Sequence, residues 1–104
     1  MAQFDVYENT DQNTHQANPY YLDVQSDLLA DLATRVVIPL ITKEYITLPV
    51  GILNPVVRVT DKTLYLSVSQ IQCLHKNRLG KKIADVTSQR QAVRAAMDFL
   101  LAVE

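Results

Sequence analysis

The histidines and the cysteine are the side chains that could bind a metal or act as a nucleophile. His15 and His75 are the two histidines, and the single cysteine, Cys73, stands two residues before His75. One cysteine and one histidine fall short of the three or four ligands of a zinc site. His15 lies in a polar stretch and fits a solvated side chain, whereas Cys73 fits a small core residue. A lone cysteine forms no internal disulfide, which suits a reducing compartment.

The acidic residues offer no clear catalytic pair. Asp23, Asp27 and Asp31 are spaced by four, a spacing that aligns side chains on one face of a helix. The local alternation of apolar and polar residues predicts a strand and then a turn, however, so we expect Asp27 to be a turn or capping residue. The sequence has two glycines and no G-x-S-x-G, G-x-G-x-x-G or P-loop pattern. We therefore expect a protein that is not an enzyme, with no catalytic residue, metal or cofactor.

Length and composition favour one folded domain spanning 1–104, because domains usually have about 100–150 residues. The hydrophobic fraction of 48% is sufficient for a core and argues against a disordered regulator. Ten basic and eleven acidic residues give a formal charge of −1, whereas nucleic-acid binders usually carry a basic excess. No apolar run approaches the ~20 residues of a membrane span. We also predict no export signal, and so a cytoplasmic location.

Alternation of apolar and polar residues predicts several short strands. Polar residues 8–18 are expected to form an exposed loop, while 41–51 fit either a strand or an ordered loop. Pro39 suggests that its strand is at an edge or has a bulge, and Gly80 suggests a turn. The predicted strands are 3–7, 19–24, 35–40, the two arms 55–60 and 62–68 of a hairpin, and a short edge strand at 74–78.

The hydrophobic period changes near the C-terminus. Apolar residues recur at i, i+3, i+4, i+7 and i+8, the pattern of an amphipathic helix, and we place this helix at about 88–103. Thr87 or Ser88 could cap it, and Ser88 with Gln91 matches a capping box. Strands followed by one helix predict a mainly β protein, with an antiparallel, barrel-like sheet capped by the helix. The apolar helix positions are Val93, Ala96, Met97, Leu100 and Leu101.

Leu28 and Leu29 follow the polar pair Ser26-Asp27, at the point where the strand alternation stops. A small domain gains little from two leucines beside a polar turn, because exposed apolar surface is unfavourable in water. Two explanations remain open on the residues alone. The leucines pack under the following loop, or they contact a partner protein.

Six segments of the chain carry a resemblance to one family. They are QFDVY at 3–7, YLDVQSDLL at 21–29, RVVIPL at 35–40, NPVVRVTD at 54–61, IADVT at 83–87 and RAAMDFLL at 94–101. Together they resemble CcdB, the plasmid- and chromosome-borne toxin of the ccd type II toxin–antitoxin system. The resemblance extends from Gln3 to Leu101 and is weakest at 41–51 and 73–82.

The resemblance implies an SH3-like antiparallel barrel with a C-terminal helix, assembled as a homodimer. CcdB-like toxins are not enzymes. They bind the A subunit of DNA gyrase at its dimerisation region and trap gyrase with its DNA cleaved. CcdA-like antitoxins neutralise them with a disordered segment that folds around the toxin dimer. The loops at 8–18 and 41–51 are candidate antitoxin contacts, and no membrane partner or sequence-specific nucleic-acid binding is expected.

The resemblance also implies which residues face gyrase. Leu28 and Leu29 would form an apolar anchor inside a polar rim, the usual arrangement of an interface. Asp98 matches a helix position where the best-known member has Asn, and the C-terminal residues complete the surface. The implied gyrase-binding set is Gln3, Phe4, Ser26, Asp27, Leu28, Leu29, Asp98, Ala102, Val103 and Glu104.

Two segments depart from the family pattern. The best-known member ends in Trp-Gly-Ile, which is central to poisoning, whereas this chain ends in Ala102-Val103-Glu104 and has no tryptophan. Residues 76–82 are also more basic than usual, which fits either a solvated face or a changed partner surface.

Three hypotheses therefore stand. The first is a gyrase poison with altered tail contacts. The second is a diverged CcdB-fold protein that keeps dimerisation and antitoxin binding without poisoning gyrase. The third is an unrelated small barrel that binds nucleic acid through basic residues, namely Lys76, Arg78, Lys81 and Lys82.

Overall fold

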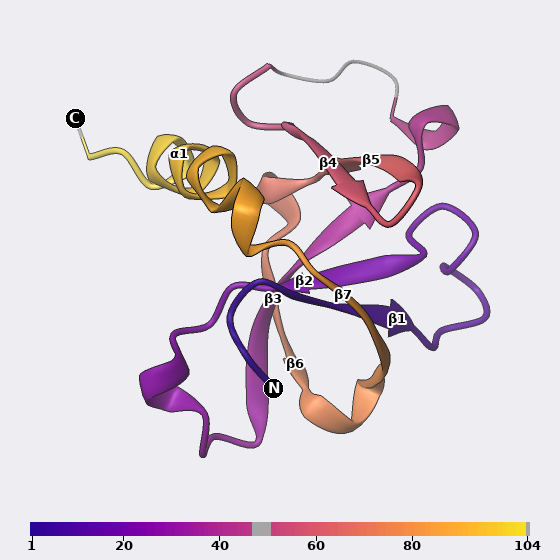
Figure 1. Ribbon diagram of the computed structural model, residues 1–104, viewed down its shortest axis with the longest axis vertical. Coiled ribbons are helices and arrows are strands. Elements are labelled where there is room, and N and C mark those ends of the chain that lie inside the picture. Colours follow the sequence, from indigo (N-terminus) through magenta and orange to yellow (C-terminus); the bar gives the residue numbers. More distant parts are fainter. Residues whose placement is uncertain (47–50, 104) are drawn as a thin grey trace.

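A computed structural model describes residues 1–46 and 51–103, which form seven strands and one α-helix (Figure 1). The elements are β1 (Asp5–Asn9), β2 (Tyr20–Asp23), β3 (Thr34–Ile41), β4 (Val56–Val59), β5 (Lys62–Leu66), β6 (Gln72–His75), β7 (Leu79–Asp85) and α1 (Arg90–Leu100). All strand pairs are antiparallel, in the order β4-β5-β3-β2-β1-β7, with β6 paired to β3. This curved half-barrel with a C-terminal helix confirms the predicted fold class.

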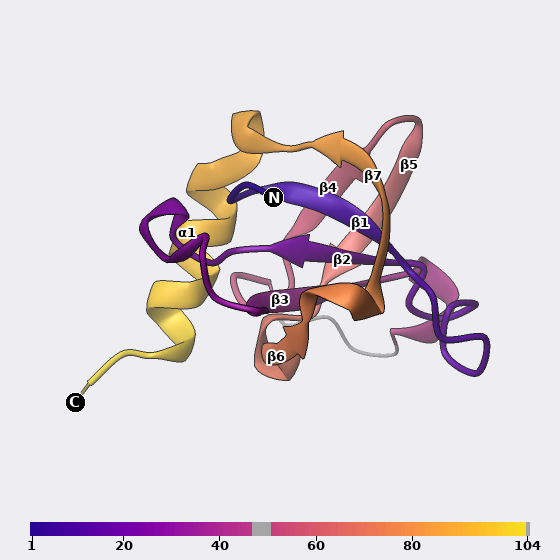
Figure 2. The ribbon, with the colours of Figure 1, turned by 90° about the horizontal axis from the view of Figure 1, so that it is seen from below.

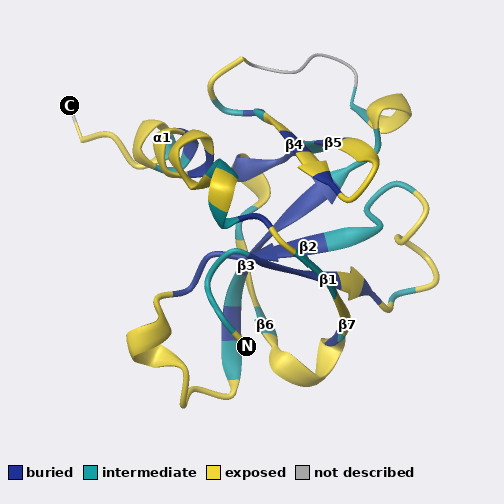
Figure 3. Ribbon diagram, in the orientation of Figure 1, coloured by how far each residue is buried: buried dark blue, intermediate teal, exposed yellow. Residues whose placement is uncertain are grey.

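The main core lies between the concave sheet and α1. Strands place alternate side chains on opposite faces, and the sheet accordingly buries Val6, Leu22 and Ile38 on the helix side. The helix contributes Val93 and Ala96, both fully buried. Figure 3 shows that burial concentrates in the central strands, while the loops and the outer helix face are exposed.

The opposite face of the sheet is also covered. Tyr7, Tyr21 and Val37 form a second apolar cluster there. β7 pairs with β1 and β6 pairs with β3, and these two strands bring Leu79 and Leu74 against the cluster. The polar side predicted for the second strand is therefore buried rather than solvated, so its charged residues need partners.

Pro39 lies in the central strand β3, so the predicted edge position is wrong. β3 pairs with β6 through residues 34–37 and with β5 through residues 40–41, and Pro39 falls between the two partners. Its carbonyl accepts a hydrogen bond from the Ser67 N–H at 3.0 Å. The missing proline N–H therefore removes no bond between β3 and either neighbour.

The turn predicted at Gly80 is also wrong, because Gly80 lies within β7. A Cβ atom there would stand 3.0 Å from Glu8 Cβ and from Thr10 Cγ2. Gly80 thus permits a close approach of β1 and β7. The short strand predicted at 74–78 is displaced to β6, and residues 76–78 form a 3-10 turn after it.

The helix begins at Arg90, after a 3-10 turn at Thr87–Gln89, and no side chain caps its first turn. The predicted cap at Thr87 or Ser88 is therefore wrong.

Two residues expected in the core are exposed. Leu101, expected to pack on the sheet, is exposed just beyond the helix, and Cys73 is exposed on β6. The expected hairpin does form, as β4 and β5. Part of the uncertain 41–51 stretch, residues 47–50, lies outside the described residues.

Candidate functional site

Residues 26–30, here called the leucine loop, hold two leucines outside the sheet. Ser26 Oγ accepts a hydrogen bond from the Leu28 N–H at 3.2 Å, and the Ser26 carbonyl accepts one from the Leu29 N–H at 3.0 Å. These bonds close one 3-10 turn at Asp27–Leu29. Leu28 is 95% exposed and Leu29 is 50% exposed. Leu28 therefore does not pack under the following loop.

Buried and half-buried amides fix the leucine loop to the barrel. The Gln3 N–H donates to Asp27 Oδ1 at 2.8 Å. Asp27 also begins the 3-10 turn, as expected of a turn residue. Gln25, which is buried, donates from Nε2 to the Leu29 carbonyl at 2.9 Å and accepts at Oε1 from the Val36 N–H at 3.0 Å. The loop is therefore tied both to the N-terminal segment and to β3.

Phe4 has a strained backbone conformation, and its peptide groups bond at the ends of β2 and β7. Its φ of 71° lies in the left-handed region, which is uncommon for residues other than glycine. The Phe4 N–H donates to the Asp23 carbonyl at 2.6 Å, and the Phe4 carbonyl accepts from the Val86 N–H at 2.9 Å. The first strand consequently begins at Asp5, not at residue 3.

A cavity of about 530 Å³, here called the helix cavity, brings three of the predicted site residues together. Gln3 and Phe4 line it from the N-terminal segment, and Asp98 lines it from α1. Figures 1 and 2 show the leucine loop and α1 on the same side of the barrel. The sequence reasoning missed four further lining residues, namely Arg90, Gln91, Arg94 and Met97.

The C-terminal tail projects away from the sheet (Figure 2). Val103 is 97% exposed and Ala102 is also exposed, and neither lines the helix cavity. Glu104 lies outside the described residues. The structure thus places Ala102 and Val103 just beyond the end of α1 and, among the described residues, gives neither a hydrogen bond with the leucine loop.

A buried ion pair lies in the strands that carry the leucine loop, and the sequence reasoning missed it. Arg35 Nε and Asp23 Oδ2 are 2.7 Å apart, and the two side chains are 1% and 0% exposed. Asp23 Oδ1 also accepts the Gln25 N–H at 3.0 Å. The hydrogen bond that Arg35 donates to Asp23 raises the pKa of Arg35, so the guanidinium stays charged. The spacing alone gave no sign that the face of Asp23 is covered.

A second polar group lies nearby, on β1. The Tyr7 hydroxyl donates to Asp5 Oδ2 at 3.1 Å, and Lys82 Nζ lies 3.2 Å from Asp5 Oδ1. Burial, with a smaller effect of the Asp5 charge, raises the pKa of Tyr7 to about 12. Lys82 is therefore engaged within the fold, and it is not a free member of the basic cluster predicted at 76–82.

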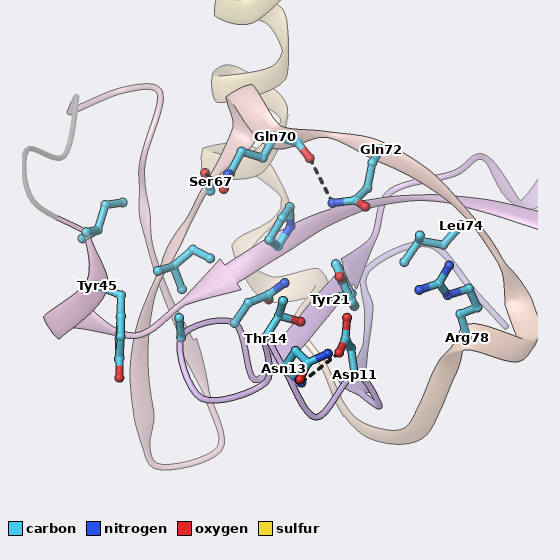
Figure 4. Close-up of a pocket in the computed structure, with 15 residues that line it drawn as sticks. Asp11, Asn13, Thr14, Tyr21, Tyr45, Ser67, Gln70, Gln72, Leu74 and Arg78 are labelled. Atoms are coloured by element: carbon cyan, nitrogen blue, oxygen red, sulfur yellow. Dashed lines mark hydrogen bonds between the residues drawn. The ribbon is translucent and has the colours of Figure 1, made fainter.

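A groove of about 670 Å³ opens between the two loops considered as antitoxin contacts (Figure 4). Thr14 and Asn18 line it from one loop, and Tyr45 and Ile46 line it from the other. Gln70, Gln72 and Arg78 close the remaining sides, and Asp11 and Arg78 are its charged lining residues. The part of the chain that the structure describes holds no group of three or more His, Cys, Asp or Glu residues that could bind a metal ion.

Comparison with known proteins identifies the family. The family model for the CcdB protein matches residues 3–102. The chain belongs to the CcdB family. A search of curated proteins gave no match to the chain. Within the described residues, no helix is long and apolar enough to cross a membrane.

Two solved structures share this CcdB-family fold. One, described as "Endoribonuclease in complex with its cognate antitoxin from Mycobacterial species", is 21% identical with a TM-score of 0.79, over 100% of this chain and 97% of that chain. Another, "Endoribonuclease from Mycobacterial species", is 22% identical with a TM-score of 0.78, over 99% of this chain and 92% of that chain. At these identities the likeness establishes the fold alone.

Proposed function

We propose that this CcdB-family protein is the toxin of a type II toxin–antitoxin system and that it poisons DNA gyrase by binding its A subunit. The carrying observation is the exposure of Leu28 on a turn fixed by Ser26, Gln25 and Gln3. An exposed leucine on a rigid, polar-rimmed turn is suited to a protein interface. A surface of this kind needs no catalytic residue.

The groove between the two loops is the proposed antitoxin site. Its volume of about 670 Å³ and its mixed polar and apolar lining suit an extended peptide segment. Tyr21 and Leu74 supply apolar contact, while the Arg78 guanidinium offers donors to a peptide backbone. Because this groove is lined by different residues from the helix cavity, antitoxin and gyrase would contact different faces.

A second candidate function is a diverged CcdB-fold protein that binds antitoxin without poisoning gyrase. The C-terminal tail favours this alternative, because Ala102 stands where the best-known family member has an aromatic anchor. Loss of such an anchor costs about 2 kcal/mol or more of binding free energy. The proposed poison must recover this energy elsewhere on the surface.

We do not propose ribonuclease activity, although two proteins of similar fold are named endoribonucleases. RNA cleavage requires a general base and a general acid within hydrogen-bond reach of the reacting groups. Neither His15 nor His75 lines the groove or the helix cavity, although Asp11 and Arg78 line the groove. We favour an inhibitor because the exposed Leu28 suits a protein interface, and an RNA digestion reaction belongs in its test.

The test is a cleavage assay with purified gyrase, supercoiled DNA, ATP and the purified protein. We expect linear DNA to accumulate after denaturation of the proteins. The variant L28S/L29S should reduce this product about tenfold or more, because both leucines are exposed anchors. I52S, which removes another half-exposed apolar side chain at a different surface, is the matched control.

The outcomes separate the candidates. Linear DNA that is lost only in L28S/L29S supports the gyrase poison. No linear DNA from the folded parent, with product restored by the tail variant A102W/V103G/E104I, supports the diverged protein. Equal product from the parent and L28S/L29S would contradict the role of the leucine loop. RNA fragments formed by the parent would contradict the non-enzymatic proposal.

A further inference from the structure

Two arginines on α1 face the helix cavity without partners. Arg90 and Arg94 are four residues apart, so they lie on one side of the helix, and both are exposed and line the cavity. Among residues 1–46 and 51–103, neither guanidinium forms an ion pair or a hydrogen bond. Both positive charges are therefore available to a ligand.

The wall beside these arginines is apolar and fixed. Phe4 and Met97 line the cavity and pack against the main core. Backbone hydrogen bonds to Asp23 and from Val86 hold Phe4 at both of its peptide groups. The cavity thus combines two cations with a preorganised apolar surface, an arrangement that lowers the ordering cost of binding.

The charge of the cavity is positive, although the whole chain has a formal charge of −1. Arg90 and Arg94 outnumber Asp98, the one acidic residue among its lining residues. A guanidinium binds a carboxylate strongly, because two parallel N–H donors match its two oxygens. The local charge therefore selects an anionic group.

Gln3 links the helix cavity to the leucine loop. It lines the cavity, and its N–H donates to Asp27 Oδ1 in the loop at 2.8 Å. The cavity and the leucine loop therefore share Gln3 as a neighbour, and a protein that covers the loop and Gln3 reaches the edge of the cavity.

We propose that the helix cavity binds an aspartate or glutamate side chain, next to an apolar residue, on the protein that the leucine loop contacts. This inference rests on the proposed function, in which that protein is the gyrase A subunit. A protein carboxylate fits better than a DNA phosphate, because Phe4 and Met97 form an apolar wall and the chain lacks the basic excess of a nucleic-acid binder.

The experiment measures binding of the purified dimerisation-region fragment of gyrase A at low and high salt, for example about 50 and 300 mM. We expect R90Q/R94Q to weaken binding about tenfold at low salt and to flatten the salt dependence, since two attractive charges are lost. D98N should strengthen binding, because it removes the competing carboxylate. K76Q/K81Q removes two charges near the β6–β7 turn and should leave affinity unchanged.

Several results would overturn the inference. If R90Q/R94Q binds like the parent with the same salt dependence, the acidic-ligand role is wrong while the proposed function stands. If the two variants of α1 affect binding only when cleaved DNA is present, the ligand is a phosphate. If the folded parent fails to bind the fragment at all, the proposed function fails and this inference fails with it.

Discussion

Asp23 and Arg35 form an ion pair that has no contact with solvent, directly below the strand ends that carry the leucine loop. Among the described residues, Arg35 Nη1 and Nη2 have no hydrogen-bond partner, so the pair only partly offsets its desolvation. Removing one member of a buried pair typically costs about 3–5 kcal/mol, because the other charge stays buried. The pair therefore adds little net stability compared with an apolar pair of similar size, although the loss of either member alone is costly.

The buried hydroxyl of Tyr7 predicts that the stability of the protein depends on pH. The folded protein raises the pKa of Tyr7 from 10.0 to about 12, chiefly by burial. Because the folded state holds the Tyr7 proton more tightly than the unfolded state, Tyr7 contributes its full stabilisation at pH values below the pKa of the unfolded chain. This stabilisation is lost as the pH rises from 10 toward 12. We expect urea unfolding of the parent to show a steeper fall in stability across this window than Y7F shows.

Y65F is the matched control, because Tyr65 is a half-buried tyrosine on β5 for which the hydroxyl has no partner among the described residues. Y65F should follow the parent curve. If the stability of the parent and of Y7F falls in parallel above pH 10, folding does not raise the pKa of Tyr7.

We predict that the conformation of the leucine loop depends on Gln25. This buried amide accepts the Val36 N–H and donates to the Leu29 carbonyl. In Q25M the side chain keeps a similar volume but can bond neither the Val36 N–H nor the Leu29 carbonyl. An unpaired polar group costs about 1–3 kcal/mol when it is buried. We expect faster hydrogen exchange at Leu28 and Leu29 and a weaker response in the gyrase cleavage assay. Q72M, at an exposed site on β6, is the control.

Unchanged exchange at Leu28 and Leu29 in Q25M would mean that Ser26 and Asp27 suffice to fix the loop. A global loss of protection would instead mean that Gln25 acts on the whole fold. Only protection lost locally, with the strands still protected, agrees with a positioning role for this side chain.

Elements with a regular period could be predicted from the sequence, and elements set by tertiary contact could not. The hairpin β4–β5 and the face of α1 with Val93 and Ala96 follow local alternation and helical spacing. The positions of Pro39 and Gly80 depend on which strands lie beside them, so their local sequence predicted an edge and a turn that do not form. Asp27 was predictable as a turn residue, because the alternation of the strand stops there. Arg90 and Arg94 were not predictable as site residues, because only the fold brings Phe4 beside them.

At the scale of the whole molecule, the apolar surface at the end of α1 suggests how two copies associate. Phe99, in the last turn of α1, and Leu101, just beyond it, are both more than half exposed. A domain of about 100 residues buries a limited fraction of its surface, so burial of exposed apolar side chains between two copies would add stability. This surface is separate from the groove proposed for antitoxin.

We therefore predict a homodimer, with a sedimentation mass about twice the 11.7 kDa of the chain. F99S/L101S should shift the protein to monomer, because the two side chains are the apolar centre of the predicted interface, while L28S/L29S should remain dimeric. A parent that sediments as a monomer contradicts the dimer. A dimeric F99S/L101S instead moves the interface elsewhere, and the β6 edge, with its exposed residues, becomes the next surface to alter.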